Sequence, residues 1–326
     1  MDTIATLRNV VIFSTKESLY FAELIAKGLG LEVSGTERKN FGGVEQYYRL
    51  NIDSRDDLIG KTAIFVGSTH TDEQVNELYR VGCALAGYGT TRRIFVIPFL
   101  GYSTMERAKY PGEVVMAKVV ARQLSSIPNS GMGNVFLMMD LHVSGLVHYF
   151  EGDCLRYELY AEKQLTAAIR ELGLDNFMFA SADLGRPAWV ATFAKIFQTG
   201  FALIDKGREF EKTEVLAVIG DVRGKNVIIY DDMTRSAGTI IQAAKAYLEH
   251  GAAAVYAVLS HCALNDGSIV VDLIDSPITK LVTTNTHPMS QQVKDCEQSR
   301  SLVNRFKVCD VSGEFVGTIR KILNDN

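Results

Sequence analysis

One segment combines carboxylates, hydroxyls and a glycine where a buried strand is expected to meet a helix. The apolar run Val227–Tyr230 is followed by two acids and then by Met-Thr-Arg-Ser-Ala-Gly-Thr, which opens a stretch of helical period. Free backbone N–H groups at a helix N-terminus bind phosphate, and carboxylates accept hydrogen bonds from sugar hydroxyls. Gly238 allows close approach of the backbone to a ligand. The segment predicts a site for a phosphorylated sugar, formed by Asp231, Asp232, Thr234, Arg235, Ser236, Ala237, Gly238 and Thr239.

An ordinary capped helix is the competing interpretation of these residues. Ser236 would then serve only as the N-cap, whose side-chain oxygen accepts a hydrogen bond from a backbone N–H of the first turn. The combination of a buried strand, paired acids and a loop of small residues favours the ligand site over this alternative.

The elements that must position this site follow a regular pattern. Short apolar, β-branched runs alternate with amphipathic helical segments, which is typical of parallel sheets covered on both faces. The pattern predicts an α/β protein with mainly parallel sheets flanked by helices. The expected strands are Val10–Phe13, Thr62–Val66, Ile94–Pro98, Val135–Met139, Phe177–Ser181, Val215–Ile219, Val227–Tyr230, Ala253–Leu259 and Leu281–Thr284. The expected helices are Lys16–Gly28, Asp72–Tyr88, Gly112–Leu124, Tyr160–Glu171, Pro187–Gln198, Ser236–His250 and Gly313–Leu323.

The length of 326 residues suggests two domains, because single cores rarely grow beyond ~250–300 residues. We expect an N-terminal domain over residues 1–154 and a C-terminal domain over residues 155–307. A final strand and helix over residues 308–326 are expected to pack back on the N-terminal domain.

Composition excludes several functional classes. Apolar residues make up 47% of the chain and charged residues 22%, which is globular rather than disordered. A formal net charge of -4 lacks the basic excess typical of nucleic-acid binding, and no run approaches the ~18 apolar residues of a membrane span. The cysteine count is odd and no C-x-x-C occurs, which predicts reduced thiols in a cytoplasmic protein rather than disulfides or a zinc site.

The sugar-site segment resembles the ribose 5-phosphate loop shared by phosphoribosyltransferases and phosphoribosyl pyrophosphate (PRPP) synthetases. Other segments resemble the synthetases in the same order along nearly the whole chain, so the protein is identified as a member of that family. These segments are Val96–Pro98 with Gly101 and Tyr102, Ala117–Ala121, Met139–His142 (M-D-L-H), Leu159–Glu162 (L-Y-A-E), Ser181–Gly185, Ile204–Arg208 (a K-x-R catalytic loop), Val218–Val222 and Lys307–Ile319.

The resemblance implies two phosphoribosyltransferase-like domains and a diphosphoryl transfer. The C1 hydroxyl of ribose 5-phosphate attacks the β-phosphorus of ATP or another nucleoside triphosphate, and the nucleoside monophosphate leaves. Such chemistry depends on positioning and on charge neutralisation by Mg²⁺. The resemblance also implies a homo-oligomer, because the family completes its nucleotide site across a subunit contact.

The resemblance assigns further roles. Lys206 and Arg208 would be catalytic, stabilising charge on the transferred phosphates. Asp183 and His142 would contact the metal, although a hydrogen-bonded structural role is the alternative for His142. The nucleotide and pyrophosphate contacts would come from Phe41, Glu45, Arg107, Asp183, Gly185 and Arg186.

Four positions depart from the family pattern. Thr104 and Met105 stand where the family has a nucleotide-contacting Arg and Gln, and threonine cannot replace a bidentate arginine on phosphate. Arg107 can compensate from three positions away. Gly43 replaces the acid in the F-x-D-G-E segment that recognises adenine, and Arg235 replaces an Asp in the sugar loop.

The flag segment resembles the plant-type class II branch of the family. Ser103–Arg107, Gly112–Val114 and Ala117 fit its pattern, and so does Arg122–Pro128. This resemblance implies a less restricted diphosphoryl donor and weak allosteric control by phosphate and ADP. Two alternatives to a synthetase stay open: a non-catalytic, synthetase-associated regulatory homologue and a base-exchanging phosphoribosyltransferase.

Overall fold

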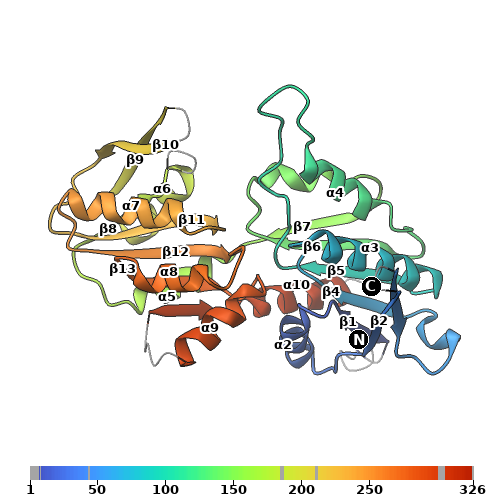
Figure 1. Ribbon diagram of the computed structural model, residues 1–326. Coiled ribbons are helices and arrows are strands. Elements are labelled where there is room, and N and C mark those ends of the chain that lie inside the picture. The colour runs from blue at the N-terminus through green and yellow to red at the C-terminus, as the bar shows by residue number, and fades with distance from the viewer. Residues whose placement is uncertain are drawn as a thin grey trace. The chain divides into compact units, whose positions relative to one another are not determined.

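The computed structural model describes residue 7 and residues 9–42, 45–183, 187–209, 212–299 and 305–324. The chain divides into two compact units (Figure 1). Unit 1 comprises Met1–Tyr160 together with Val311–Asn326, and unit 2 comprises Ala161–Asp310.

Unit 1 is built on a five-stranded sheet in the order β1-β4-β5-β6-β7, in which every neighbouring pair is parallel. Its strands are β1 (Val10–Ser14), β4 (Thr62–Val66), β5 (Arg92–Ile97), β6 (Gly133–Met139) and β7 (Leu155–Leu159). The division between the units follows Tyr160, whereas the sequence placed it after Cys154, because β7 pairs with β6 and so belongs to the N-terminal sheet.

Helices and short 3-10 turns cover this sheet. The helices of unit 1 are α2 (Leu19–Leu29), α3 (Asp72–Gly87), α4 (Met116–Ser125) and α10 (Ser312–Asn324), and the 3-10 turns are η1 (Arg55–Leu58) and η2 (Ser144–Tyr149). Leu78 of α3 and Leu124 of α4 pack in one buried cluster with Phe95. Helices α2 and α10 pack on each other, with the rings of Phe21 and Phe315 edge to face at 5.5 Å.

Local signals explain where these helices begin and end. Thr71 is the N-cap of α3, and its side chain accepts a hydrogen bond from Gln74 N at 3.3 Å. Helix α2 ends at Gly30, whose left-handed φ of 73° closes the last turn. Helix α4 begins at Met116 rather than at the expected Gly112, because Gly112 has a φ of 89° and cannot belong to a right-handed helix.

A hairpin that the sequence did not predict also belongs to unit 1. Strands β2 (Thr36–Phe41) and β3 (Glu45–Leu50) pair antiparallel in a separate two-stranded sheet. Their residues are mostly polar or charged, so they lack the apolar pattern that revealed the other strands.

Unit 2 contains a seven-stranded sheet in the order β10-β9-β8-β11-β12-β13-β14. All neighbours are parallel except β9 and β10, which form an antiparallel hairpin at one edge. The strands are β8 (Phe177–Ser181), β9 (Phe201–Glu209), β10 (Lys212–Ile219), β11 (Asn226–Thr234), β12 (Ala254–Cys262), β13 (Ile278–Thr284) and β14 (Phe306–Cys309).

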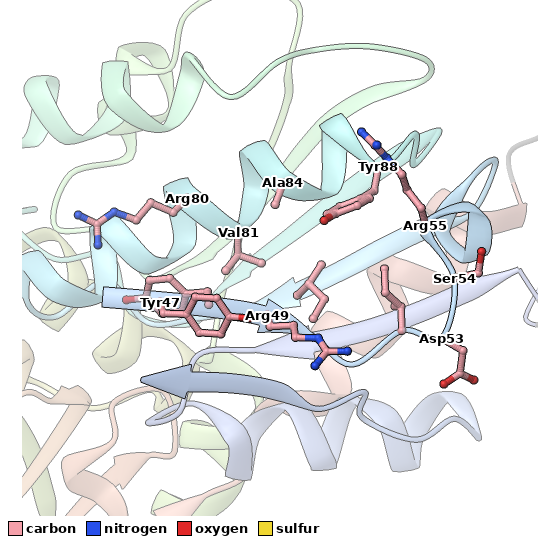
Figure 2. Close-up of a pocket in the computed structure, with 12 residues that line it drawn as sticks. Tyr47, Arg49, Asp53, Ser54, Arg55, Arg80, Val81, Ala84 and Tyr88 are labelled. Atoms are coloured by element: carbon pink, nitrogen blue, oxygen red, sulfur yellow. The ribbon is translucent and has the colours of Figure 1, made fainter. Parts of the chain in front are cut away.

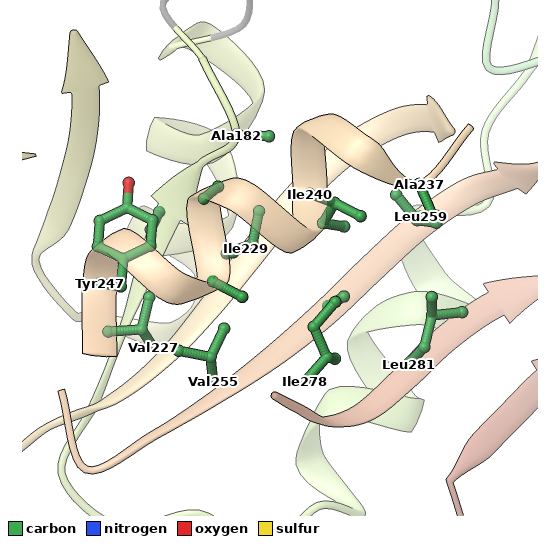
Figure 3. Packing of buried hydrophobic residues seen from close by; sticks show 14 of the residues in the cluster. Ala182, Val227, Ile229, Ala237, Ile240, Tyr247, Val255, Leu259, Ile278 and Leu281 are labelled. Atoms are coloured by element: carbon green, nitrogen blue, oxygen red, sulfur yellow. The ribbon is translucent and has the colours of Figure 1, made fainter. Parts of the chain in front are cut away.

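The core of unit 2 forms where α7 packs on the central strands (Figure 3). Ile240 and Tyr247 of α7 lie against Val227 and Ile229 of β11 and against Val255 of β12. The helices of this unit are α5 (Glu162–Arg170), α6 (Pro187–Phe197), α7 (Gly238–Glu249), α8 (Ile269–Asp275) and α9 (Met289–Ser299). Every expected strand and helix is present, β4 and β8 with the predicted ends and the others with at least one end shifted. The predicted α/β class with mainly parallel sheets is confirmed.

Within the part of the chain that the structure describes, no helix has the length and apolar character needed to cross a bilayer.

Candidate active site

Strand β11 carries the two predicted acids to the carboxyl edge of the unit 2 sheet. It runs parallel between β8 and β12. The sequence predicted that this strand ends at Tyr230, but it continues to Thr234, which pairs with Cys262 of β12. Asp231 and Asp232 are therefore held within the sheet rather than in a mobile turn, and their backbone is fixed before any ligand binds.

The carboxylates at this edge repel one another. Asp232 is buried, and its backbone N–H donates to Asp231 Oδ1 at 2.9 Å. Burial raises the pKa of Asp231 well above its usual range, and the negative charges of Asp232 and Asp183 raise it further. Asp183 follows β8, so the acids of two neighbouring strands gather at one edge of the sheet. A bound cation would relieve this repulsion.

The loop after β11 is held by its own hydroxyl and by the backbone of another loop. Thr234 Oγ1 accepts from Ala237 N at 3.2 Å, and Ser236 Oγ accepts from Gly238 N at 3.4 Å. Arg235 O accepts from the N–H of Asn265, which lies beyond β12, at 3.0 Å. Ser236 and Thr239 are exposed, so their hydroxyl groups are accessible to a ligand.

Ala237 has an unusual backbone for a non-glycine residue. It is the N-cap of α7, with a left-handed φ of 57°, and its side chain is completely buried. The interpretation of Ser236 as an ordinary N-cap is therefore wrong, and α7 begins at Gly238 rather than at Ser236. A left-handed alanine costs about 1–2 kcal/mol, and such strain occurs most often at functional sites.

The predicted cationic residues lie on the edge hairpin of unit 2. Lys206 and Arg208 belong to strand β9, where they pair with Val215 and Thr213 of β10. The sequence predicted a loop here, and the structure differs because β9 continues through these positions in its pairing with β10. The other two predicted residues of this unit, Gly185 and Arg186, lie outside the described residues.

Unit 1 carries the remaining predicted residues at three places. His142 is partly exposed and follows β6, just after Asp140, which has a left-handed φ of 40°. Arg107 is exposed in the loop between β5 and α4, with its Nε 3.3 Å from Glu106 Oε1. That loop also holds the departures Thr104 and Met105.

The nucleotide residues predicted nearer the N-terminus lie on the β2–β3 hairpin. Phe41 and Glu45 are directly opposite each other at its tip. Phe41 is 55% exposed, and its ring packs edge to face on Tyr47 with centroids 5.5 Å apart. Gly43 lies outside the described residues.

A surface pocket of about 630 Å³ in unit 1 contains none of the predicted site residues (Figure 2). Tyr47 and Arg49 of β3 line one side, and Arg80 of α3 and Tyr88, which follows that helix, line the other. This pocket therefore stays separate from the chemistry that the sequence predicted.

A buried polar network beside the sugar loop was missed by the sequence reasoning. Thr286 Oγ1 hydrogen-bonds His261 Nδ1 at 2.7 Å and Thr284 Oγ1 at 2.9 Å, while Thr284 Oγ1 donates to Ser260 O at 2.6 Å. Ser260 Oγ in turn pairs with Tyr230 OH at 3.2 Å. The available signal was the run of polar residues directly after the apolar parts of β12 and β13. The network links the ends of three strands beneath the candidate site.

The carboxylates at the edge of the unit 2 sheet are the kind of ligand that Mg²⁺ prefers. Among the described residues, no three or more His, Cys, Asp or Glu side chains gather closely enough to hold a metal ion by themselves. Mg²⁺ usually binds through one or two carboxylates together with water and substrate phosphates, so the carboxylates of Asp183 and Asp231 fit this ion without a full protein cage.

Sequence comparisons match both ends of the chain to one group of proteins. Residues 10–127 match the family described as the N-terminal domain of ribose phosphate pyrophosphokinase. Residues 205–326 match the family described as the phosphoribosyl synthetase-associated domain.

Whole-chain relatives agree with these matches. The ribose-phosphate pyrophosphokinase of Xylella fastidiosa (strain 9a5c) is 30% identical and covers 99% of this chain and 96% of its own length. The ribose-phosphate pyrophosphokinase of Gloeobacter violaceus is 31% identical, and the match covers 95% of this chain and 90% of that protein. A crystal structure of phosphoribosylpyrophosphate synthetase from Mycobacterium smegmatis shares the fold, with a TM-score of 0.83 and 23% identity. The match covers 98% of this chain and 100% of that chain.

The fold and the loop after β11 define a protein of the phosphoribosyltransferase-like class, with mainly parallel sheets and a candidate sugar-phosphate site at a sheet edge. Within that class, the chain belongs to the ribose-phosphate pyrophosphokinase family of enzymes.

The strain at Ala237 leads to a first prediction. Ala237→Gly should leave the stability of unit 2 unchanged or raise it by up to about 1 kcal/mol, because relief of the left-handed strain offsets the loss of a buried methyl group and the greater unfolded-state entropy of glycine. Ala243→Gly is the matched control, since Ala243 is equally buried but helical. It should destabilise by about 1 kcal/mol or more. Urea unfolding of both variants measures the effects, and equal destabilisation would show that Ala237 is not strained.

The raised pKa of Asp231 leads to a second prediction. Folding favours the protonated acid, so the free energy of unfolding falls as pH rises from the ordinary value of 3.8 through the folded-state pKa. Asp231→Asn removes this penalty and should raise the melting temperature at pH 7 by about 2–4 °C. The gain should vanish below about pH 4. A gain that persists at pH 3 would assign the effect to something other than the charge of this carboxylate.

Proposed function

We propose that this protein transfers the β,γ-diphosphoryl group of a nucleoside triphosphate to the C1 hydroxyl of ribose 5-phosphate, giving PRPP and a nucleoside monophosphate. The end-to-end relationship to ribose-phosphate pyrophosphokinases carries this proposal, since identities of 30% and 31% extend over nearly the whole length of both chains. The loop between β11 and α7 supports it with a local geometry suited to a sugar phosphate.

The 5-phosphate would bind at the N-terminus of α7. Ser236 and Thr239 offer exposed hydroxyls there, and the N-terminus of the helix adds a partial positive charge. Asp231 and Asp232 would accept hydrogen bonds from the ribose hydroxyls at the end of β11. Thr234 would act indirectly, because its hydroxyl accepts from Ala237 N and so keeps the turn in shape.

Mg²⁺ would be held at the acidic edge of unit 2 by Asp183. The family resemblance assigns a metal contact to His142 as well. When bound, the ion neutralises phosphate charge. The carboxylate of Asp183 adds to the repulsion that raises the pKa of Asp231, and this agrees with an edge that favours a cation.

Lys206 and Arg208 would stabilise the charge that develops on the transferred phosphates. Both belong to an edge hairpin in which only β9 contacts the rest of the sheet, since β10 pairs with β9 alone. An edge hairpin can present cations toward a substrate without disturbing the buried core.

The nucleotide would bind with help from Phe41, Glu45 and Arg107. Phe41 and Glu45 stand at the exposed tip of a hairpin, which suits a contact with a second copy of the chain and therefore a homo-oligomer. The plant-type class II character of the flag segment would make the choice of nucleoside triphosphate broad. We also place the protein in the reducing cytoplasm, where free thiols such as Cys83, Cys154, Cys262 and Cys309 persist.

Product formation tests the reaction directly. The protein is incubated with Mg²⁺, ribose 5-phosphate and ATP, GTP or CTP in turn, and PRPP and nucleoside monophosphate are measured. We expect equal amounts of both products, with more than one donor accepted. A folded protein that yields neither product with any donor would favour the alternative of a non-catalytic, synthetase-associated regulatory homologue. The family match over residues 205–326 carries a description of that kind. Base exchange with added PRPP would instead indicate a phosphoribosyltransferase.

The role of Lys206 makes a third prediction. Lys206→Ala should lower kcat by about 10²–10³-fold while KM for ribose 5-phosphate changes little, because contacts to developing charge strengthen in the transition state. Lys245→Ala is the matched control, since Lys245 is exposed on α7 and should tolerate the change. Steady-state kinetics separates the two parameters. Equal kcat values for both variants would remove Lys206 from the catalytic step.

A further inference from the structure

The β2–β3 hairpin has few means of holding its own position. It is a separate two-stranded sheet, and two-stranded hairpins are marginally stable in water by themselves. Leu50 is its one buried residue among those that the structure describes. Contacts with the rest of unit 1 must therefore fix its orientation.

The hairpin has two chemically distinct faces, because side chains alternate along each strand. On one face, Tyr48 packs against the buried cluster beneath α3, and Gln46 donates to Glu73 Oε1 at 3.1 Å and accepts from Arg80 Nη1 at 2.9 Å. On the other face, Phe41 contacts Tyr47. The docking face consists of Arg38, Asn40, Gln46 and Tyr48, and the outward face of Glu37, Lys39, Phe41, Glu45, Tyr47 and Arg49.

Arg38 is the side chain that joins the hairpin to two other elements. Its Nε and Nη2 donate to Glu77 Oε1 of α3 at 2.8 Å and 2.6 Å. The same Nη2 donates to Ser14 O at the end of β1 at 2.5 Å, and Nη1 donates to Thr36 O at 3.0 Å. One guanidinium therefore ties β2 to both the central sheet and the covering helix.

Glu77 makes this contact from a buried position. Its side chain is 3% exposed, whereas that of Arg38 is 25% exposed. Burial raises the pKa of Glu77, and the hydrogen bond and charge of Arg38 act in the opposite direction. Buried pairs add little net stability compared with apolar replacements, but a planar guanidinium holds a carboxylate in a defined geometry.

We propose that the Arg38–Glu77 pair is a positioning element that sets the orientation in which the hairpin presents Phe41 and Glu45 to a nucleoside triphosphate. The inference rests on the proposed function, because the nucleotide role of those two residues does. Arg38 lies three residues before Phe41 on the opposite face of the same strand, so a rotation of the docking face moves the outward face with it.

The first experiment compares Glu77→Gln with Glu151→Gln. Glu151 pairs with Arg122 at 3.0 Å, but both side chains are more than half exposed, so the same substitution there is the matched control. In Glu77→Gln, hydrogen exchange should rise about tenfold or more across residues 36–50 and stay unchanged in β4–β6. KM for the nucleotide should rise about tenfold, with kcat and KM for ribose 5-phosphate within twofold of the wild type.

The second experiment separates positioning from stability. The double variant Arg38→Met, Glu77→Leu replaces the pair by apolar side chains and should recover the wild-type melting temperature. Its KM for the nucleotide should stay raised, and Phe41→Ala should add little to the effect of Glu77→Gln, because both act through one contact.

A wild-type nucleotide KM in the double variant would overturn the proposal, and so would unchanged hairpin exchange in Glu77→Gln. If the wild-type protein forms no PRPP, the proposed function is refuted instead. The hydrogen-exchange comparison would still test whether the Arg38–Glu77 pair fixes the hairpin.

Discussion

The parallel pairing of β11 with β8 and β12 determines where the candidate site of unit 2 lies. Parallel strands all end at the same edge, and the residues that follow them are the ones free to differ from the buried apolar pattern. This constraint brings Asp183, Asp231 and the loop before α7 to one edge of the sheet. It also places Asn265, which follows β12, where its N–H can hold Arg235 O. The order and direction of the strands therefore set the position of the candidate site, and side-chain contacts only refine it.

The same constraint has a cost, because the gathered groups are polar and partly buried. Desolvation and mutual repulsion raise the pKa of Asp231, and Ala237 is held in a left-handed conformation. Below the loop, the network of Ser260, Thr284, Thr286 and His261 satisfies polar groups at the strand ends that would otherwise be buried without partners. The apolar core and the polar network therefore support a sheet edge that carries two destabilising features, the repelling carboxylates and the left-handed alanine. Such loss of stability is common where a protein binds a ligand.

The sequence predicted the parts of the fold that depend on burial and left unpredicted the parts that depend on pairing. Val227–Tyr230 was recognisable as a strand because buried parallel strands are continuously apolar. The β2–β3 hairpin was not, since its strands are mostly polar and it is held in place by contacts of Arg38, Gln46 and Tyr48 with the rest of unit 1. Lys206 and Arg208 carry no strand signal either, because only their pairing with β10 places them in β9. The left-handed conformation of Ala237 could not be predicted either, because alanine rarely adopts it and the residue type gives no sign of it.

The departure at Arg235 illustrates what structure adds to a comparison of residue types. An arginine where relatives carry an acid suggests a damaged sugar loop. In this fold the loop is shaped by Thr234 Oγ1, by Ala237 N and by the carbonyl oxygen of Arg235, none of which depends on the side chain at position 235. The replacement changes charge and leaves the backbone of the loop intact. A cation at the N-terminus of a helix adds to a potential that already favours phosphate. The effect of Arg235 should therefore fall on the balance between phosphate affinity and product release rather than on the formation of the site.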